Sequence, residues 1–519
     1  MDRAVALYGE AQALFRVGDI AGAGDRLDQA MRLRPNFAEG LAFGGYLIEL
    51  SGKLETAARF YGRALELKAD MPVVWANYGK ALFRLRQFVG ALAAFDAGLE
   101  RRATDADLWN GRAAALRELG RLEDSADAAA RALRYDPASA EAAVNLGNAL
   151  HKLARPSEAL LAYNKACDLH PDYGDALCGT GLALRALGRL DEARSAFAQA
   201  EALGCREAIS GRGCLDLMLG DFENGWEGYE ARWISGRSLT DALGVRFPWW
   251  RGPGRAGERV LVLNDHGLGD TIQFGRYLPM MREQGVAATF VVPRRLQGLL
   301  APTVGARLVD SVPEHEVFDA QIALSSLPRA FRTRAESIPA EVPYLVADPA
   351  RASRWRERMG ARGFRVGVVW QGNPDPAADR ARSFPLAALG ALAAIPDVRL
   401  ISLQKPDAAL VVAAPFALET LGPDFDAGEE AFADTASAMM SLDLVVSADT
   451  SVAHLAGALA RPVWIALKFD AEWRWLRDRD DSPWYPTARL FRQTEAGDWT
   501  GVFARMAAAL RRRRQSRTA

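Results

Sequence analysis

The sequence predicts two folds in succession along 519 residues: an α-helical superhelix of repeated helix pairs, and then an α/β region with two parallel-sheet lobes. Three observations lead to this prediction. A helical pattern recurs every 34 residues through the first 207 residues. The recurrence stops near Ser235, where a segment rich in glycine, proline and tryptophan begins. Beyond that segment, short apolar stretches alternate with helical ones, which is typical of parallel sheets with crossover helices.

The first 207 residues contain six units of equal length. The residues that close successive helical stretches are Pro35, Ala69, Ala103, Pro137, Pro171 and Cys205. In the same frame, small residues recur at Ala23, Ala57, Ala91, Ser125, Ala159 and Ala193. A large apolar residue follows four positions later in every unit except the one that has Ala129 there. Small residues let the two helices of a unit touch and large ones fill the gap between units, so we predict six helix–turn–helix repeats. Residues 208–257 are expected to add capping helices and a connector.

Six apolar segments predict the strands of the second half, at Arg259–Leu263, Ala288–Val292, Phe364–Trp370, Val398–Leu403, Leu442–Ser447 and Pro462–Leu467. A break near residues 344–363 separates two sets of strands and helices. We therefore predict a first lobe over residues 258–350 and a second over residues 351–519, which ends in a helix at Thr500–Arg514.

Charge and composition narrow the class of protein. The chain has 64 Lys and Arg residues and 65 Asp and Glu residues, so its net charge is −1. It therefore lacks the excess of positive charge that a nucleic-acid partner needs. No window is apolar enough for a membrane span, and the N-terminus has no apolar stretch of a secretory signal, so we expect a cytoplasmic protein. The four cysteines lack CxxC spacing and no HExxH motif occurs, so no metal cofactor is expected.

The first candidate site directly follows the first predicted strand of the α/β region. Gly267 and Gly269 let the backbone approach a ligand and direct free N–H groups toward oxygen atoms. The segment is not a dinucleotide fingerprint, because Ile272 stands in place of the last glycine. Asp270 is either an N-cap satisfied by backbone amides or a cleft carboxylate that takes a proton from an attacking hydroxyl. His266 is the other candidate for that chemistry.

The second candidate site comprises Asp449, Thr450, Ser451 and His454, where another strand passes into a helix. Two hydroxyls and free backbone N–H groups at the positive end of a helix form a cradle for a phosphate group. His454 lies about one turn inside the helix and is expected to face the same opening. An N-cap with a satisfied histidine is the alternative for each residue taken alone.

Further polar residues follow two other strands of the second lobe: Gln371, Asn373 and Arg382 after one, and Gln404 and Lys405 after the next. In open α/β sheets, ligands gather outside the carboxyl ends of the strands. Two cations and a helix terminus in one lobe therefore predict an anion-binding site.

The repeats carry a separate candidate surface. Their first helices hold Asn77, Asn110, Asn145 and Asn148, which are candidates to face a concave groove. An asparagine amide can both donate to and accept from a peptide backbone. A merely solvated helix face explains the same residues equally well.

Several of these residue patterns match known families. The 34-residue unit resembles the tetratricopeptide repeat, which implies a groove for an extended or helical polypeptide. The second half contains GLGDTIQFGRYLP, VGVVWQGNP, RSFPLAAL, SLQK, ADTSVAHLAGAL and WRWLRDRDDSPWYPTARLFRQ. These motifs resemble the glycosyltransferase-like domain of bacterial tetratricopeptide proteins, which is similar to the heptosyltransferases and has the two-lobed GT-B fold. Repeats followed by a two-lobed transferase also resemble O-GlcNAc transferase and bacterial flagellin glycosyltransferases.

The resemblance implies roles for particular residues. The heptosyltransferase first loop falls on Gly269 and Asp270, where the family has a proposed base. The donor-site run falls on the residues from Asp449 to Leu455, with Ser451 in place of a glycine. Arg382 takes the place of a basic residue that precedes a Trp-Pro pair, although Ser-Phe-Pro stands here. Lys405 takes the place of a polar residue that reaches the nucleotide.

The sequence and the resemblance together predict a metal-independent, inverting protein O-glycosyltransferase. Its nucleotide-sugar donor would be a CMP-nonulosonic acid or a UDP- or GDP-sugar, and its acceptor a Ser or Thr of a protein, flagellin by resemblance, held by the repeats. One alternative is a heptosyltransferase-like enzyme that acts on a glycan or lipid. The other is a repeat scaffold whose transferase region binds a nucleotide without turnover.

Overall fold

The computed structural model describes residues 2–235, 247–372, 379, 381–405, 414–430 and 432–518. The chain forms two compact units, Met1–Leu184 and Arg185–Ala519. Within the described residues, no helix combines the length and apolar character needed to cross a bilayer.

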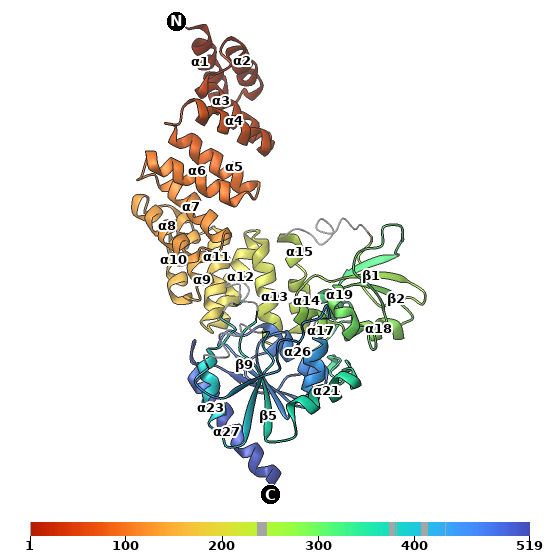
Figure 1. The fold of residues 1–519 in the computed structure, drawn as a ribbon. Helices are drawn as coiled ribbons and strands as arrows, with labels where there is room; N and C mark the ends of the chain where they lie inside the picture. Colours follow the sequence, from red (N-terminus) through yellow and green to blue (C-terminus); the bar gives the residue numbers. More distant parts are fainter. Residues whose placement is uncertain are drawn as a thin grey trace. The chain divides into compact units, whose positions relative to one another are not determined.

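The first unit is a stack of antiparallel helix pairs, as Figure 1 shows. Aspartate and serine N-caps begin several of these helices, for example Asp105 before α7 and Ser139 before α9. The helices are α1 (Arg3–Arg16), α2 (Ile20–Leu33), α3 (Ala38–Leu50), α4 (Leu54–Leu67), α5 (Pro72–Arg84), α6 (Phe88–Arg101), α7 (Ala106–Glu118), α8 (Leu122–Tyr135), α9 (Ala140–Lys152), α10 (Pro156–Leu169) and α11 (Gly174–Ala186).

Glycines in the first helices of the repeats make room for the large rings of the second helices. The Phe95 ring lies between Gly79 and Gly111, where an added Cβ would come within 2.6 and 2.3 Å of it. Tyr163 lies in the same way between Gly147 and Gly179, at 2.6 and 2.3 Å. Both rings are almost fully buried. Each ring thus joins its own repeat to the next, which explains the period of the sequence.

The second unit begins with the end of the repeat array, in which α12 (Leu190–Ala202), α13 (Arg206–Met218) and α14 (Phe222–Tyr229) pack in succession and α15 (Arg232–Ser235) packs on α13. Part of the predicted connector, residues 236–246, lies outside the described residues. The helical repeats followed by parallel sheets confirm the predicted fold class.

The first sheet has four parallel strands in the order β3-β2-β1-β4. β1 (Arg259–Leu263) is central and pairs with β2 (Ala287–Val291) and β4 (Ala320–Ala323), while β3 (Arg307–Val309) forms the edge. The helical elements of this region are α17 (Leu268–Phe274), α18 (Tyr277–Glu283), α19 (Arg294–Leu300), η1 (Leu324–Ser326), α20 (Leu327–Ala330) and η2 (Ala335–Ser337).

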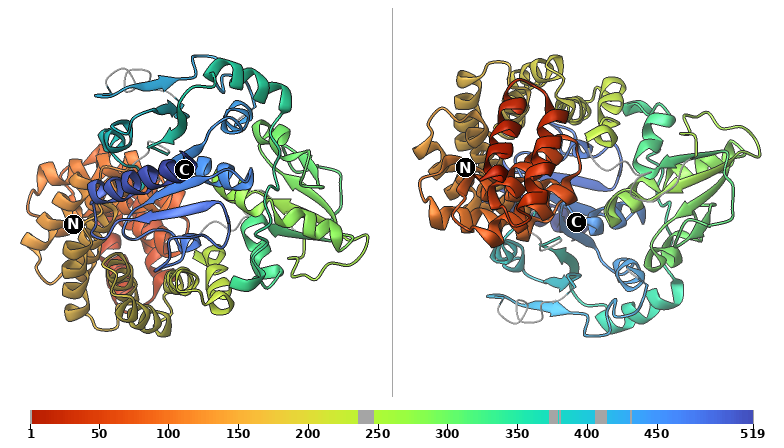
Figure 2. Two further views of the ribbon diagram at one scale, coloured as in Figure 1. Left: turned by 90° about the horizontal axis from the view of Figure 1, so that it is seen from below. Right: turned by 90° about the horizontal axis from the view of Figure 1, so that it is seen from above.

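The second sheet has six parallel strands in the order β10-β9-β8-β5-β6-β7. Both views of Figure 2 show its strands, in teal and blue, as a group separate from the green strands of the first sheet. The strands are β5 (Phe364–Val369), β6 (Val398–Ser402), β7 (Leu418–Thr420), β8 (Leu444–Ala448), β9 (Val463–Leu467) and β10 (Ala488–Arg492). The helical elements are α21 (Pro349–Met359), η3 (Leu386–Leu389), α23 (Gly390–Ala393), α25 (Ala433–Met439), α26 (Ser451–Ala458), η4 (Trp473–Trp475) and α27 (Trp499–Thr518).

The predicted strands all exist, and their ends agree with the structure to within two residues. Four strands were not predicted: β3 and β7, which have three residues each, together with β4 and β10. One face of the second sheet packs against α27, whose Val502, Phe503 and Met506 are buried against Trp370 and Phe491. This core fixes the carboxyl edge of the sheet, where the candidate residues lie.

Candidate functional site

The two glycine- and hydroxyl-bearing junctions of the α/β region lie against each other. α17 begins after β1 of the first sheet, α26 begins after β8 of the second, and the two helices are in contact. A Cβ added to Gly269 would lie 3.0 Å from Cδ2 of His454 and 3.4 Å from Cα of Ser451. A side chain at Gly269 would therefore separate the two helices. The structure thus brings the first candidate site to the second.

Asp270 makes an ion pair across this contact. Its Oδ1 accepts a hydrogen bond from Nη2 of Arg474 at 2.8 Å, and Arg474 also donates to Oε1 of Gln273 at 2.5 Å. Burial opposes ionisation of Asp270, but Arg474, His266 and His454 together hold the pKa of this carboxyl below its ordinary value. The N-cap of α17 is Gly267, so the interpretation of Asp270 as an N-cap is wrong. Its partner is a cation from the second lobe.

The strand ends of the second sheet meet as the sequence predicts. Oε1 of Gln404 accepts a hydrogen bond from the backbone N–H of Gln371 at 3.1 Å, which joins the ends of β6 and β5. A Cβ on Gly372 would lie 3.4 Å from Cγ2 of Thr450, which follows β8. Thr450 is the N-cap of α26, and its hydroxyl accepts a bond from the backbone N–H of Val452 at 3.3 Å. Asn373 lies outside the described residues.

Charged groups surround this edge. Burial and the nearby Glu472 raise the pKa of Asp449 to about 6, while Arg474 and Arg382 act in the opposite direction. Arg382 is half-buried, and its Nε donates to the carbonyl of Asp379 at 3.2 Å. Lys405 is exposed at the end of β6. Arg382 and Arg474 thus lie near Asp449 at the start of α26, an arrangement that suits an anion.

His454 does not face an opening, contrary to the prediction. Its side chain is buried, its ring stacks on Trp475 at 5.3 Å, and its Nδ1 lies 2.9 Å from the Tyr485 hydroxyl. Burial and the charge of Arg474 keep the pKa of His454 well below its ordinary value. The reason for the difference is its place one turn into α26, where the helix packs against aromatic rings. His454 is therefore a neutral packing residue rather than a cation for a phosphate.

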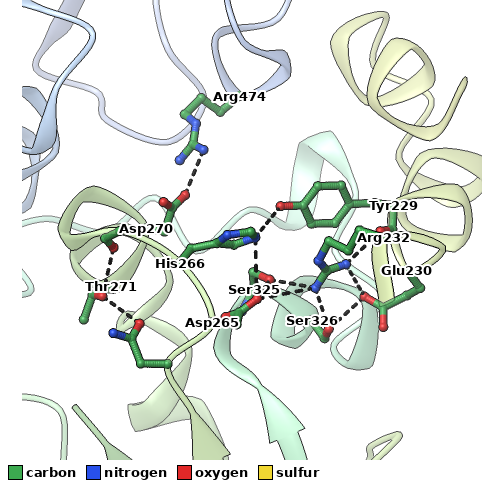
Figure 3. Close-up of polar contacts among 12 residues, drawn as sticks. Tyr229, Glu230, Arg232, Asp265, His266, Asp270, Thr271, Ser325, Ser326 and Arg474 are labelled. Carbon is green, nitrogen blue, oxygen red and sulfur yellow. Dashed lines mark hydrogen bonds and ion pairs between the residues drawn. The ribbon is translucent and has the colours of Figure 1, made fainter. Parts of the chain in front are cut away.

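His266 belongs to a polar network that includes the end of the repeat array (Figure 3). Its Nε2 lies 3.1 Å from the hydroxyl of Tyr229 in α14 and 3.5 Å from Oδ2 of Asp265. Nη2 of Arg232, from α15, donates to the hydroxyls of Ser325 and Ser326 at 2.7 and 2.9 Å. The last helices of the repeats thus contribute directly to the surroundings of this histidine.

The asparagines of the repeats differ from the open ladder expected from the sequence. Asn110 and Asn145 are 7 % and 8 % exposed, and the Asn145 amide donates to Oδ1 of Asn110 at 2.7 Å. Asn145 occupies the repeat position of Gly111 and Gly179, which each face a large ring of the preceding repeat. In the repeat that precedes Asn145, Ala129 stands in place of that ring, so the amide fills the space. Asn77 and Asn148 are half-buried, and Oδ1 of Asn148 accepts a bond from Tyr163 at 2.8 Å.

Several residues of the candidate site were not predicted from the sequence. Arg474 lies in the tryptophan-rich segment that supported the resemblance, but nothing in the pattern marks it as the partner of a residue 204 positions earlier. Tyr229 and Arg232 lie in helices that were interpreted as a cap. Lys468, after β9, is half-buried, and burial lowers its pKa. Its position after a buried strand is the signal that could have identified it.

Comparisons with known proteins define the class of the first half. Two family models, both described as tetratricopeptide repeat, match residues 50–115 in one case and residues 115–173 and 144–208 in the other. The helical array is thus a tetratricopeptide-repeat solenoid, and the α/β region follows it along the chain. Such repeats support a role in binding protein partners.

A relative matches nearly the whole chain. The chain is 29 % identical over 501 residues to Protein FlbA of Caulobacter vibrioides, and the alignment covers 89 % of this chain and 82 % of that protein. It is 33 % identical over 98 residues to Tetratricopeptide repeat protein 8 of Caenorhabditis elegans, which covers 18 % of this chain and 19 % of that one.

Solved structures resemble part of the chain. A tetratricopeptide repeat protein from Parabacteroides merdae has a TM-score of 0.40 and 16 % identity, and the match covers 47 % of this chain and 97 % of that one. The MamA protein has a TM-score of 0.30 and 21 % identity, and the match covers 33 % of this chain and 93 % of that one.

Proposed function

We propose that this chain is a protein O-glycosyltransferase that moves a sugar from a nucleotide-sugar donor to a Ser or Thr of a protein held by the repeats. One observation carries the proposal: α17 packs against α26, so that Gly269 lies beside Ser451 and His454. This packing supports an arrangement in which an acid–base loop faces an anion-binding loop. A group-transfer enzyme needs both sides together, because one positions the nucleophile and the other receives the leaving group.

The second sheet would hold the donor. The leaving phosphate would lie at the start of α26, at the backbone N–H groups after Thr450, with Arg382 and Lys405 supplying positive charge. Gln371 and Gln404 would border the nucleotide. Arg474 would reach the same phosphate from its place beside Asp270, which keeps its guanidinium fixed at the junction.

The first sheet would hold the acceptor hydroxyl beside Asp270 or His266. Attack of this hydroxyl on the anomeric carbon breaks the bond to the phosphate and inverts that centre. The repeats favour a polypeptide acceptor, and the resemblance to flagellin glycosyltransferases makes flagellin the first acceptor to test. The same resemblance implies a CMP-nonulosonic acid as the donor, and a UDP- or GDP-sugar is the alternative.

The test is a transfer assay with the full chain. Flagellin is incubated with the chain and each class of nucleotide-sugar, and intact-protein mass spectrometry reads the product. We expect a mass increase of one sugar with a single donor class, and none when Arg382 and Lys405 are both changed to Ala. Label in lipopolysaccharide and none in protein would favour the heptosyltransferase-like alternative. Nucleotide binding by calorimetry without turnover of any donor would favour the scaffold.

A further inference from the structure

His266 is held from one side by groups from two distant parts of the chain. Figure 3 shows Tyr229 and Arg232 on that side, and Asp270 with Arg474 on the other. Burial raises the pKa of Tyr229, so its phenol stays protonated at neutral pH. Both contacts of the histidine use Nε2, and no residue in the described part of the chain hydrogen-bonds Nδ1. The side chain is 34 % exposed, so a substrate can reach the imidazole.

The Asp265 carboxylate is fixed beside Nε2. Its Oδ1 accepts a bond from the backbone N–H of Ser325 at 3.1 Å, and the Ser325 hydroxyl donates to Oδ2. The guanidinium of Arg232 lies 3.7 Å from Oδ2, and the Asp265 side chain is 1 % exposed. A carboxylate in this place favours the imidazole tautomer with its hydrogen on Nε2, which leaves the lone pair of Nδ1 free.

Asp270 is less suited to accept a proton. Its Oδ1 is occupied by Arg474, and its pKa is below the ordinary value, so it is a weaker base than a free aspartate. Its negative charge lies near His266, where it would stabilise an imidazolium. The titratable and charged groups that face His266 are thus Tyr229, Arg232, Asp265, Asp270 and Arg474.

We propose that His266, rather than Asp270, takes the proton of the acceptor, and that Asp265 and Tyr229 are positioning residues for it. This inference rests on the proposed function. The acceptor oxygen forms its bond to the anomeric carbon while its proton passes to Nδ1 of His266. The bond from the anomeric carbon to the phosphate oxygen breaks, and its electron pair leaves with the nucleotide phosphate. The end of the repeat array is therefore a part of the catalytic site.

Transfer kinetics of full-length variants test the assignment. We expect His266→Gln to lower kcat about 100-fold or more with little change in the KM for the donor, because His266 contacts only the acceptor. His315→Gln, at an exposed histidine of the same lobe, is the matched control and should behave like the wild type. Asp270→Asn should lower kcat far less than His266→Gln does, whereas Asp265→Asn and Tyr229→Phe should each lower kcat with little change in the KM for the donor.

A second measurement is independent of activity. Diethyl pyrocarbonate modifies accessible unprotonated imidazoles, and mass spectrometry locates the product. We expect fast modification of His266 in the full chain, at a rate that Asp265→Asn and Tyr229→Phe change. An unreactive His266 overturns the inference. Wild-type kcat in the His266→Gln variant also overturns it while the proposed function stands. A reactive His266 in a chain that transfers no sugar supports its positioning and removes the proposed function instead.

Discussion

At the residue scale, the buried histidine of α26 makes the stability of the protein depend on pH. The pKa of His454 is well below its ordinary value, so the folded protein binds fewer protons than the unfolded chain once the pH falls below about 6.5. The free energy of unfolding contributed by the neutral ring is therefore complete above pH 6.5 and is lost as the pH falls toward the lowered pKa.

We expect His454 by itself to lower the free energy of unfolding by up to about 1.4 kcal/mol per pH unit below pH 6.5, while Asp449, whose pKa is raised to about 6, acts in the opposite direction between about pH 4 and 6. The His454→Gln variant should lose this slope. Urea unfolding followed by tryptophan fluorescence measures it, since Trp475 stacks on the ring. His315→Gln should keep the wild-type slope, and the same slope in His454→Gln would contradict the assignment. Asp270 adds nothing in this range, because its lowered pKa confines its effect to pH values below about 4.

The sequence predicted the residue types of the site better than their partners. Glycines and hydroxyls after apolar strands were recognisable because a strand–helix junction is a local pattern. The pairing of Asp270 with Arg474, or of His266 with Tyr229, joins residues 204 and 37 positions apart. Those pairs depend on how the two lobes and the capping helices pack, which no local pattern records. His454 was misplaced for the same reason.

At the scale of the element, the repeat period is a packing rule that substitutions can test. Gly147 lies in α9 against the Tyr163 ring, where an added Cβ would lie 2.6 Å away. We expect Gly147→Ala to destabilise the repeats by about 1–3 kcal/mol, because the ring has a second glycine on its other side and cannot move away. Circular dichroism during thermal unfolding measures the loss.

Gly24 provides the matched control. It lies within α2 and an added Cβ would meet nothing within 4 Å. Gly24→Ala should therefore raise the stability by about 0.5–1 kcal/mol, the ordinary gain for alanine over glycine in a helix. Equal effects of the two substitutions would show that the ring contact does not set the repeat geometry.

The helices were predictable because their period repeats six times, so the pattern is redundant. The strands of the sheet interiors were predictable because they are buried on both faces and continuously apolar. β3 and β7 are short edge strands of three residues, Arg307–Val309 and Leu418–Thr420, and contain charged residues. Their pairing comes from the neighbouring strand rather than from their own sequence.

At the scale of the whole molecule, the two compact units can be separated to test the proposed roles of acceptor binding and sugar transfer. A chain of residues 185–519 keeps α12 to α15 and every described candidate of the anion site. We expect it to bind the donor nucleotide in calorimetry as the full chain does, but to lose transfer to the native protein acceptor, because most of the solenoid that we propose binds that protein is gone.

A shorter chain of residues 236–519 is to be compared with the chain of residues 185–519. It also lacks Tyr229 and Arg232, so it should show slow transfer even to a short peptide, and poor solubility because Trp226 and Phe222 no longer cover their neighbours. Efficient modification of the full-length acceptor by residues 185–519 would show that the repeats do not recognise it.

The hydrogen bonds from Arg232 to Ser325 and Ser326 limit where this chain can be joined to a repeat array from another protein. A chimera that joins a foreign repeat array to this α/β region directly before Arg259 would separate the guanidinium from its hydroxyls and His266 from its phenol. A crossover point at the boundary between Leu184 and Arg185 leaves these bonds within one parent. A chimera designed to change acceptor specificity, by gene shuffling or by design, therefore has to keep the final helices of the repeat array together with the two lobes that they contact.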